Sequence, residues 1–200
     1  MERILEENDL GLLNSAMSLV LYFANHKPES FGNLVKQVIS ILDRLIITRS
    51  CTSDYLYYRI PCPWLQCKCL KFLQLYTFPN DKIQSATLVT VLKDILSKSA
   101  ENAESVNMAN TINCILMDAV NLVILYGPDV NSEMHEQAIN WLGRFIDMKD
   151  PNTRYLGIDA MIRYVKQVTS SLSFFSFFLS FFCLFFVFFF EIGHFFCLFH

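Results

Sequence analysis

Apolar residues recur at steps of three and four along most of the chain, which is the pattern of helices with one buried face. The segments that show it are Leu10–Ala24, Phe31–Thr48, Leu65–Tyr76, Lys82–Lys98, Met108–Tyr126 and Ser132–Ile146. A seventh segment begins near Thr153 and continues through Val165. The pattern therefore predicts an all-α protein.

Turn residues join the two segments of each pair. Pro28 follows the first helix, Pro79-Asn80-Asp81 joins the third to the fourth, and Gly127-Pro128-Asp129 ends the fifth. Ser30 is expected to cap the second helix, because serine is a favoured N-cap residue. Arg49–Cys62 has no sustained period and is expected to be a long ordered loop.

The pairs recur along the chain. Their first helices begin near residues 10, 63, 107 and 153, and the rigid Pro61-Cys62-Pro63 entry of the second has a counterpart in Asp150-Pro151. Repeats of about 40 to 47 residues are typical of HEAT and armadillo arrays. We therefore predict a HEAT/armadillo-like α-solenoid of antiparallel helix pairs. Because each pair needs a neighbour to cover its apolar side, we expect further pairs in the natural protein.

The C-terminal tail differs in composition from the rest. Of the 19 Phe, 14 lie between Phe174 and Phe199, and no Lys or Arg follows Gln167. We therefore divide the chain into a HEAT-like region at 1–167 and an apolar, Phe-rich low-complexity tail at 168–200. The uncharged run 174–190 is at the lower length limit for a membrane segment. A translated pyrimidine-rich non-coding tract is the favoured interpretation, because Phe, Ser and Leu codons can be all pyrimidine.

The charge and the cysteine content limit the partners and the compartment that we expect for this protein. Residues 1–167 carry 16 basic and 18 acidic side chains without a basic cluster, which argues against a nucleic-acid partner. Seven Cys is an odd number, and no secretory signal pattern appears at the N-terminus, which favours a reducing, cytosolic compartment. Cys62, Cys67 and Cys69 are expected to be buried core thiols, since no His or second Cys pair has zinc-ligand spacing.

Catalytic chemistry has no recognisable basis in the sequence. The four histidines are His26, His135, His194 and His200, and none has a nucleophile or acid partner in a known catalytic arrangement. The sequence also has no Gly-rich phosphate-binding loop. We predict no enzyme activity and assign no catalytic, cofactor-binding or metal residues and no cofactor.

Four other side chains have two interpretations each. Asp118 and Arg154 fit a buried charge pair or ligand contacts, but inter-helix hydrogen bonding and capping are favoured. Trp64 and Trp141 fit a partner hot spot, but packing in the helix layers is favoured. Binding residues are therefore left unassigned.

Three strings carry a family resemblance. They are Asp54–Tyr58 followed by Ile60–Gln74, then Asn107–Val123 with Met117-Asp118-Ala119 at its centre, then Asn140–Ile146 followed by Asn152–Leu156. In this order and spacing, Leu5 to Gln167 resembles the large subunits of the heterotetrameric clathrin adaptor complexes, the adaptins. Tyr57-Tyr58 and Pro61-Cys62-Pro63-Trp64 favour the alpha type. Cys67, Cys69 and Gly157 depart from the family's usual residues.

The resemblance implies an N-terminal trunk fragment of a non-catalytic scaffold subunit in endocytosis and vesicle-mediated intracellular protein transport. Its partners would be the beta-type large, medium and small adaptor chains, at the cytoplasmic face of clathrin-coated pits of the plasma membrane. The family contacts phosphoinositide membrane and clathrin through parts expected to lie outside this chain. The alternatives are a helical protein with an integral membrane segment in the Phe-rich tail, and a generic HEAT-repeat scaffold.

Overall fold

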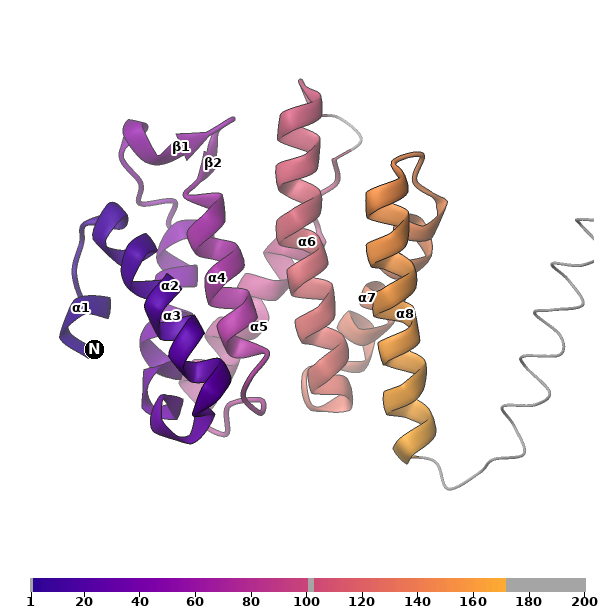
Figure 1. Ribbon diagram of the computed structural model, residues 1–200, viewed down its shortest axis with the longest axis horizontal. Helices are drawn as coiled ribbons and strands as arrows, with labels where there is room; N and C mark the ends of the chain where they lie inside the picture. The colour runs from indigo at the N-terminus through magenta and orange to yellow at the C-terminus, as the bar shows by residue number, and fades with distance from the viewer. Residues whose placement is uncertain (1, 101–102, 172–200) are drawn as a thin grey trace, which may run out of the picture. The chain divides into compact units, whose positions relative to one another are not determined.

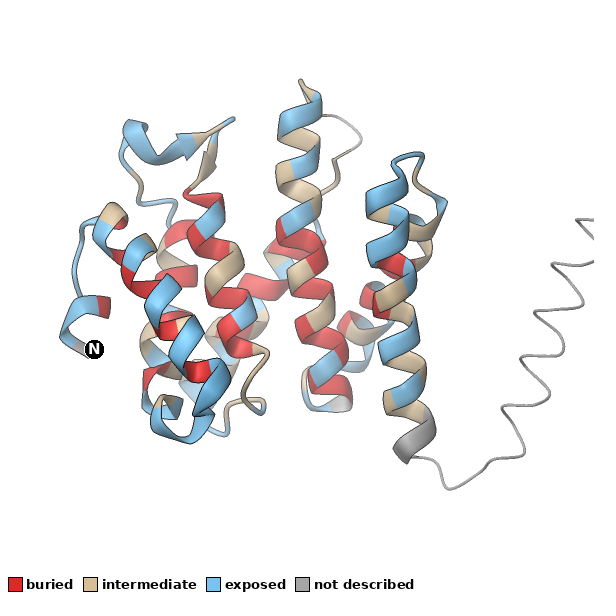
Figure 2. Ribbon diagram, viewed as in Figure 1, coloured by how far each residue is buried: buried red, intermediate tan, exposed pale blue. Residues whose placement is uncertain are grey.

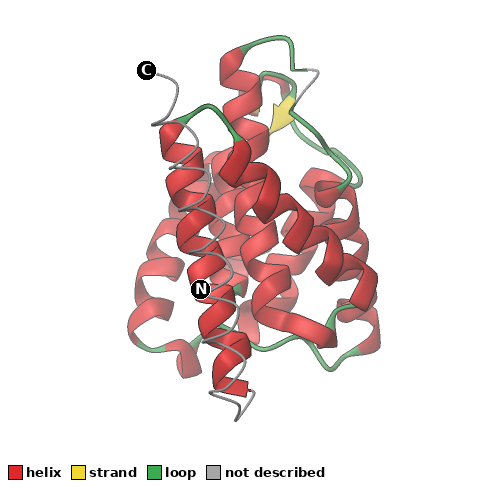
Figure 3. Ribbon diagram, turned by 90° about the vertical axis from the view of Figure 1, so that its right-hand side faces the viewer, coloured by secondary structure: helices red, strands yellow, loops and turns green. Residues whose placement is uncertain are grey.

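The computed structural model describes residues 2–100 and 103–171. It divides into two parts, 1–157 and 158–200, and only the first is large enough in described residues to show how helices pack. The described residues form eight α-helices and one two-stranded antiparallel sheet (Figures 1 and 3). The helices are α1 (Glu2–Leu5), α2 (Leu10–His26), α3 (Val35–Ile46), α4 (Pro63–Leu73), α5 (Lys82–Leu96), α6 (Val106–Tyr126), α7 (Ser132–Asp147) and α8 (Pro151–Ser171), and the strands are β1 (Leu56–Tyr57) and β2 (Ile60–Pro61).

Helices α2 to α7 form two layers. The first helix of each pair packs on the first helix of the next, so that α2 lies against α4 and α4 against α6. The second helices α3, α5 and α7 form the other layer, with α3 against α5 and α5 against α7 (Figure 1). Antiparallel pairs in two layers confirm the predicted all-α solenoid.

The core lies between these layers. Most of its side chains are aliphatic and come from every helix of α2 to α7; the largest that are fully buried include Leu13, Met17, Leu42, Leu65, Leu70, Phe72, Leu88 and Phe145 (Figure 2). Helix α6 is long and apolar enough to cross a membrane, but half of its most apolar stretch is buried inside the protein. Its composition is explained by packing against α4, α5 and α7.

Side-chain caps mark five helix starts. Hydrogen bonds from the first free backbone N–H groups of α2, α5, α6, α7 and α8 are accepted by Asp9, Asp81, Ser105, Asn131 and Asp150. The predicted Ser30 cap is wrong. Pro28–Ser30 and Gly32–Leu34 are short 3-10 turns, and α3 begins only after them, without a side-chain cap. Ser30 therefore closes a turn instead of preceding a helix.

Gly157 has a packing role that the sequence did not reveal. A Cβ atom at this position would lie 2.9 Å from Cβ of Phe145 in α7 and 3.3 Å from the backbone N of Ile146. Real Cβ atoms do not approach so closely, so the glycine allows the start of α8 to contact α7. The predicted boundary at Gln167–Val168 falls within α8, and residues 172–200 of the predicted tail lie outside the described residues.

Candidate interaction surface

The segment before α4 contains a tight β-hairpin. The sequence had predicted only a long ordered loop at Arg49–Cys62, because no apolar period is present there. Leu56 pairs with Pro61 and Tyr57 with Ile60, so that Tyr58 and Arg59 form a two-residue turn. Their φ angles are 47° and 65°, and Cys62 has φ 37° just before α4. Such turns favour Asn and Gly, since a left-handed conformation costs other residues about 1–2 kcal/mol.

Local contacts hold this turn in place. The Asn107 side-chain amide donates a hydrogen bond of 3.0 Å to the Tyr58 hydroxyl, and Arg59 pairs with Glu104 at 2.9 Å. The Cys62 backbone N–H donates to the Tyr55 carbonyl at 2.9 Å. The turn is therefore tied both to its own base and to the segment that begins α6.

Aromatic rings cover the outside of the hairpin. The Tyr57 ring lies 4.7 Å from the Tyr58 ring and 4.9 Å from the Trp64 ring, centre to centre. We call the exposed side chains Tyr55, Leu56, Tyr58 and Trp64 the aromatic hairpin surface; their exposed fractions are 38%, 44%, 42% and 57%. Exposed tyrosine and tryptophan side chains are frequent anchors of protein interfaces.

The two tryptophans have opposite environments. Trp141 is 9% exposed and its indole N–H donates to the Leu96 carbonyl at 3.0 Å, which confirms the predicted packing in the helix layers. The same prediction is wrong for Trp64. Because Pro63 is the first residue of α4, Trp64 lies on the first turn, where the hairpin and not a neighbouring helix is beside it.

Asp118 and Arg154 do not form a pair. Asp118 faces α4, where the Lys71 ammonium lies 3.8 Å from its carboxylate and the Cys67 thiol is a hydrogen-bond partner. Burial raises the pKa of Asp118 to about 6, because Lys71 is more than half exposed and offsets the lost hydration only in part. The Gln74 side-chain amide donates to the Asp118 carbonyl at 3.0 Å.

This arrangement agrees with the favoured interpretation of inter-helix hydrogen bonding for Asp118. Arg154 is exposed in the first turn of α8, and the cap there is Asp150, which accepts hydrogen bonds from Thr153. The predicted capping is therefore present, but another residue provides it.

The cysteines of the described part of the chain do not assemble into a metal site. Within residues 2–100 and 103–171, no group of three or more Cys, His, Asp or Glu side chains is placed to hold a metal ion. Cys62 and Cys69 are buried as expected, whereas Cys67 is only half-buried, with its thiol beside Asp118 of α6. Burial raises the pKa of all three thiols, so they are protonated at neutral pH.

Paired helices in two layers, with an exposed aromatic surface at the N-terminal end of α4, define a helical-repeat scaffold of the solenoid class. Residues 1–186 match the family described as the adaptin N terminal region, and the chain belongs to this family. The adaptin resemblance predicted from the three sequence strings is confirmed.

Three relatives that the chain matches are alpha-type subunits. The chain is 36% identical over 162 residues to AP-2 complex subunit alpha-2 of Dictyostelium discoideum, which covers 80% of this chain and 16% of the relative. It is 34% identical to AP-2 complex subunit alpha-1 of Arabidopsis thaliana over 82% of this chain and 16% of the relative. It is 31% identical to AP-2 complex subunit alpha of Schizosaccharomyces pombe, over 78% of this chain and 17% of the relative. The chain thus spans about one sixth of the length of these relatives.

Proposed function

We propose that this chain forms part of the trunk of an alpha-type large subunit in a clathrin adaptor complex. Its role there is non-catalytic, as a scaffold in endocytosis and vesicle-mediated protein transport at the cytoplasmic face of coated pits. The observation that carries the proposal is the 31–36% identity to three alpha-type subunits over about four fifths of the chain. Two layers of paired helices without a described metal cluster support a binding role.

The proposed partners are the beta-type large, medium and small adaptor chains. Phosphoinositide membrane and clathrin would be reached through other parts of the assembled complex. Within the described residues, the aromatic hairpin surface is the best candidate for contact with a partner chain. Trp64 is 57% exposed there and is held by Tyr57, so little side-chain freedom is lost when it is covered.

The test is co-isolation of the tagged 200-residue chain with medium and small adaptor chains expressed together with it. We expect capture of at least one of them by the wild-type chain. Leu116→Asp, which places a charge at a fully buried position, is expected to abolish capture together with the helical circular dichroism signal. No capture by a chain that is folded by circular dichroism would favour a generic HEAT-repeat scaffold.

The contribution of the hairpin is tested by Trp64→Ala in the same experiment. We expect weaker capture with an unchanged melting temperature. Tyr155→Ala is the matched control, because Tyr155 is also an exposed aromatic side chain, at 69%, and is far from the hairpin in sequence. Equal capture by both variants would remove the aromatic hairpin surface from the proposal and leave the adaptor assignment standing.

We further propose that 168–200 is a separate low-complexity segment that does not belong to the solenoid. Its uncharged run of Phe, Ser and Leu supports this, although the family match extends to residue 186. Sequencing of the mature transcript across the Gln167–Val168 codons decides the matter. Removal of the Phe-coding stretch by splicing would support a non-coding origin, whereas its retention with carbonate-resistant membrane association would support an anchor.

A further inference from the structure

Three aromatic rings beside the hairpin hold one another in place. The Tyr57 ring contacts the Tyr58 ring at 4.7 Å and 85°, and the Trp64 ring at 4.9 Å and 59°. We call these three side chains the ring platform, and Figure 1 shows the hairpin beside it at the N-terminal end of α4. Because the Tyr58 hydroxyl is also hydrogen-bonded to Asn107, the rings lose little freedom when a ligand covers them.

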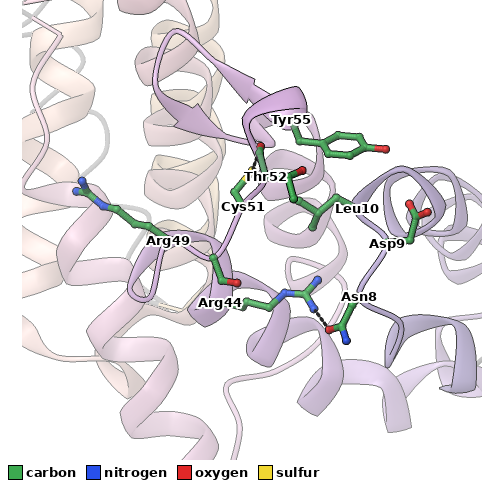
Figure 4. A pocket seen from close by; sticks show the side chains of 9 residues that line it. Asn8, Asp9, Leu10, Arg44, Arg49, Cys51, Thr52 and Tyr55 are labelled. Atoms are coloured by element: carbon green, nitrogen blue, oxygen red, sulfur yellow. Dashed lines mark hydrogen bonds between the residues drawn. The ribbon is translucent and has the colours of Figure 1, made fainter.

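Tyr55 does not belong to this platform, although it is exposed near it. Figure 4 shows its side chain directed toward the start of α2, where it lines an open cavity together with Asp9, Leu10 and Thr52. Its hydroxyl oxygen lies so near Gly11 that a Cβ atom there would be 2.5 Å away. Tyr55 therefore fixes the base of the hairpin to α2, and the ring platform is the part that a ligand can cover.

The platform presents flat apolar faces together with free hydrogen-bond donors. Both Tyr58 and Trp64 are exposed. The Trp64 indole N–H donates to no other residue that the structure describes. The Tyr58 hydroxyl accepts from Asn107, so its own O–H can still donate. A ligand that fits these features has apolar rings or methylene groups next to free carbonyl oxygens.

These features select among the backbone conformations of a peptide ligand. A helix uses its own carbonyls internally, apart from those of its last turn. An added strand needs a free edge, but β1 is two residues long, and in β2 Pro61 has no N–H and its carbonyl accepts from the Gln66 side-chain amide. A polyproline II segment has no internal hydrogen bonds, so its carbonyls are free, and it binds to aromatic-lined surfaces.

The charges beside the platform fit an uncharged ligand. Arg59 in the turn pairs with Glu104 at 2.9 Å, and the two exposed side chains neutralise each other. Residues 1–167 contain no basic cluster, which is the feature that an anionic membrane surface attracts. The surface therefore favours a neutral peptide over a layer of lipid headgroups.

The strained backbone gives independent support for a binding role. Tyr58, Arg59 and Cys62 all have positive φ angles. Strain of this kind persists where the surrounding structure holds it, and it is concentrated at functional sites. In this segment it sets the direction of Tyr58 and, through Cys62, the start of the helix on which Trp64 lies.

We propose that the ring platform binds a proline-rich segment of a partner protein in the polyproline II conformation. Proline rings pack on the exposed faces of Tyr58 and Trp64. Carbonyl groups of the peptide accept hydrogen bonds from the Trp64 indole N–H and the Tyr58 hydroxyl. This inference rests on the proposed role of the aromatic hairpin surface in protein contacts, and it does not rest on the adaptor assignment.

The test is isothermal titration calorimetry of the full chain with a proline decamer that is blocked at both ends. We expect saturable binding at one site, and no binding of a blocked glycine-serine decamer of equal length. Trp64→Ala should weaken binding at least about tenfold without a change in melting temperature. Tyr22→Ala is the matched control, because Tyr22 is an exposed aromatic side chain of α2, and it should bind as the wild type does.

Trp64→Phe separates the two contacts that Trp64 makes with the peptide. The phenylalanine ring keeps a face for proline, but the N–H that donates to a peptide carbonyl is lost. We therefore expect binding several-fold weaker than that of the wild type and tighter than that of Trp64→Ala.

Three results would overturn the proposal. The first is the absence of saturable heat with the proline decamer. The second is equal binding of the glycine-serine decamer, which would show that the surface does not select polyproline II. The third is equal affinity in Trp64→Ala and wild-type chains, which would place the peptide elsewhere.

A membrane ligand is distinguished by sedimentation of the chain with phosphatidylcholine vesicles. Vesicle binding that is lost in Trp64→Ala, without binding of the proline decamer, would overturn the peptide proposal and assign the surface to a membrane. The adaptor assignment is tested separately by capture of medium and small adaptor chains. Capture without binding of the proline decamer would overturn this inference alone.

Discussion

The helix layers and the β-hairpin before α4 use the same residue types in different ways. Within the layers, Trp141 is almost completely buried and its indole N–H is hydrogen-bonded, whereas Trp64 beside the hairpin has more than half of its surface in water. The backbone differs as well, because Tyr58, Arg59 and Cys62 have positive φ angles near the hairpin. Burial of apolar side chains therefore stabilises the helix layers, whereas the hairpin has a strained backbone and exposed apolar side chains.

We expect the largest difference in stability between the two regions when each tryptophan is replaced by alanine. Trp141→Ala removes a buried indole and leaves the Leu96 carbonyl without its donor, so the free energy of unfolding should fall by about 3–5 kcal/mol. Trp64→Ala should lower it by less than about 1 kcal/mol, since most of the side chain is already in water. Urea denaturation of both variants measures the difference; similar losses would contradict the comparison.

Helical positions were predictable because their pattern is repeated over several turns. Leu13, Ala16 and Val20 illustrate this, since their spacing places them on one face of α2, and all three are buried. The two-residue strands Leu56–Tyr57 and Ile60–Pro61 are too short to show a period, so the hairpin was missed. The signal that could have found it is the aromatic run Tyr55–Tyr58, a few positions before Pro63.

Contacts between distant residues were not predictable from spacing. The Arg44 contact with Asn8 joins residues 36 positions apart, and the Asp118 contact with Lys71 joins two repeats. Gly157 departs from the residue that is usual in the family, and the close approach of Phe145 gives the reason for a glycine at this position. These contacts therefore depend on tertiary packing, which the spacing of residues along the chain does not show.

The second largest effect concerns the one strongly buried carboxylate described at the contact of α4 with α6. The pKa of Asp118 is about 6 in the folded protein and 3.8 in its ordinary range, so folding favours the protonated form. The stability from this group is fully present below about pH 4 and is lost as the pH rises through 6. Between these limits the loss is about 2–3 kcal/mol.

Asp118→Asn should remove that slope. The groups that face Asp118 are Lys71, Cys67 and Cys114, and the two thiols stay protonated because burial raises the pKa of each. The measurement is urea denaturation of the wild type and the variant from pH 4 to pH 7.5. Parallel curves would show that Asp118 does not carry the pH dependence.

A smaller effect is expected where α8 meets α7. Gly157→Ala places a Cβ atom 2.9 Å from Cβ of Phe145, and overpacking of this kind costs about 1–3 kcal/mol, more than the roughly 1 kcal/mol gained in helix propensity. Gly143→Ala is the matched control in α7, because nothing lies within 4 Å of the added atom. It should be stabilising. Melting temperatures that rise for both variants would show that the contact is looser than the structure places it.

The smallest effect tests the strain in the hairpin itself. Arg59→Gly relieves the left-handed conformation at φ 65°, so we expect the free energy of unfolding to rise by about 1 kcal/mol. Arg59→Ala is the control, since it removes the exposed pair with Glu104 but keeps a Cβ atom at the strained position. The difference between the two variants in urea denaturation isolates the backbone contribution. If the Arg59→Gly and Arg59→Ala variants are equally stable, the turn is not strained. The contrast between the hairpin and the helix layers would then depend on side-chain exposure alone.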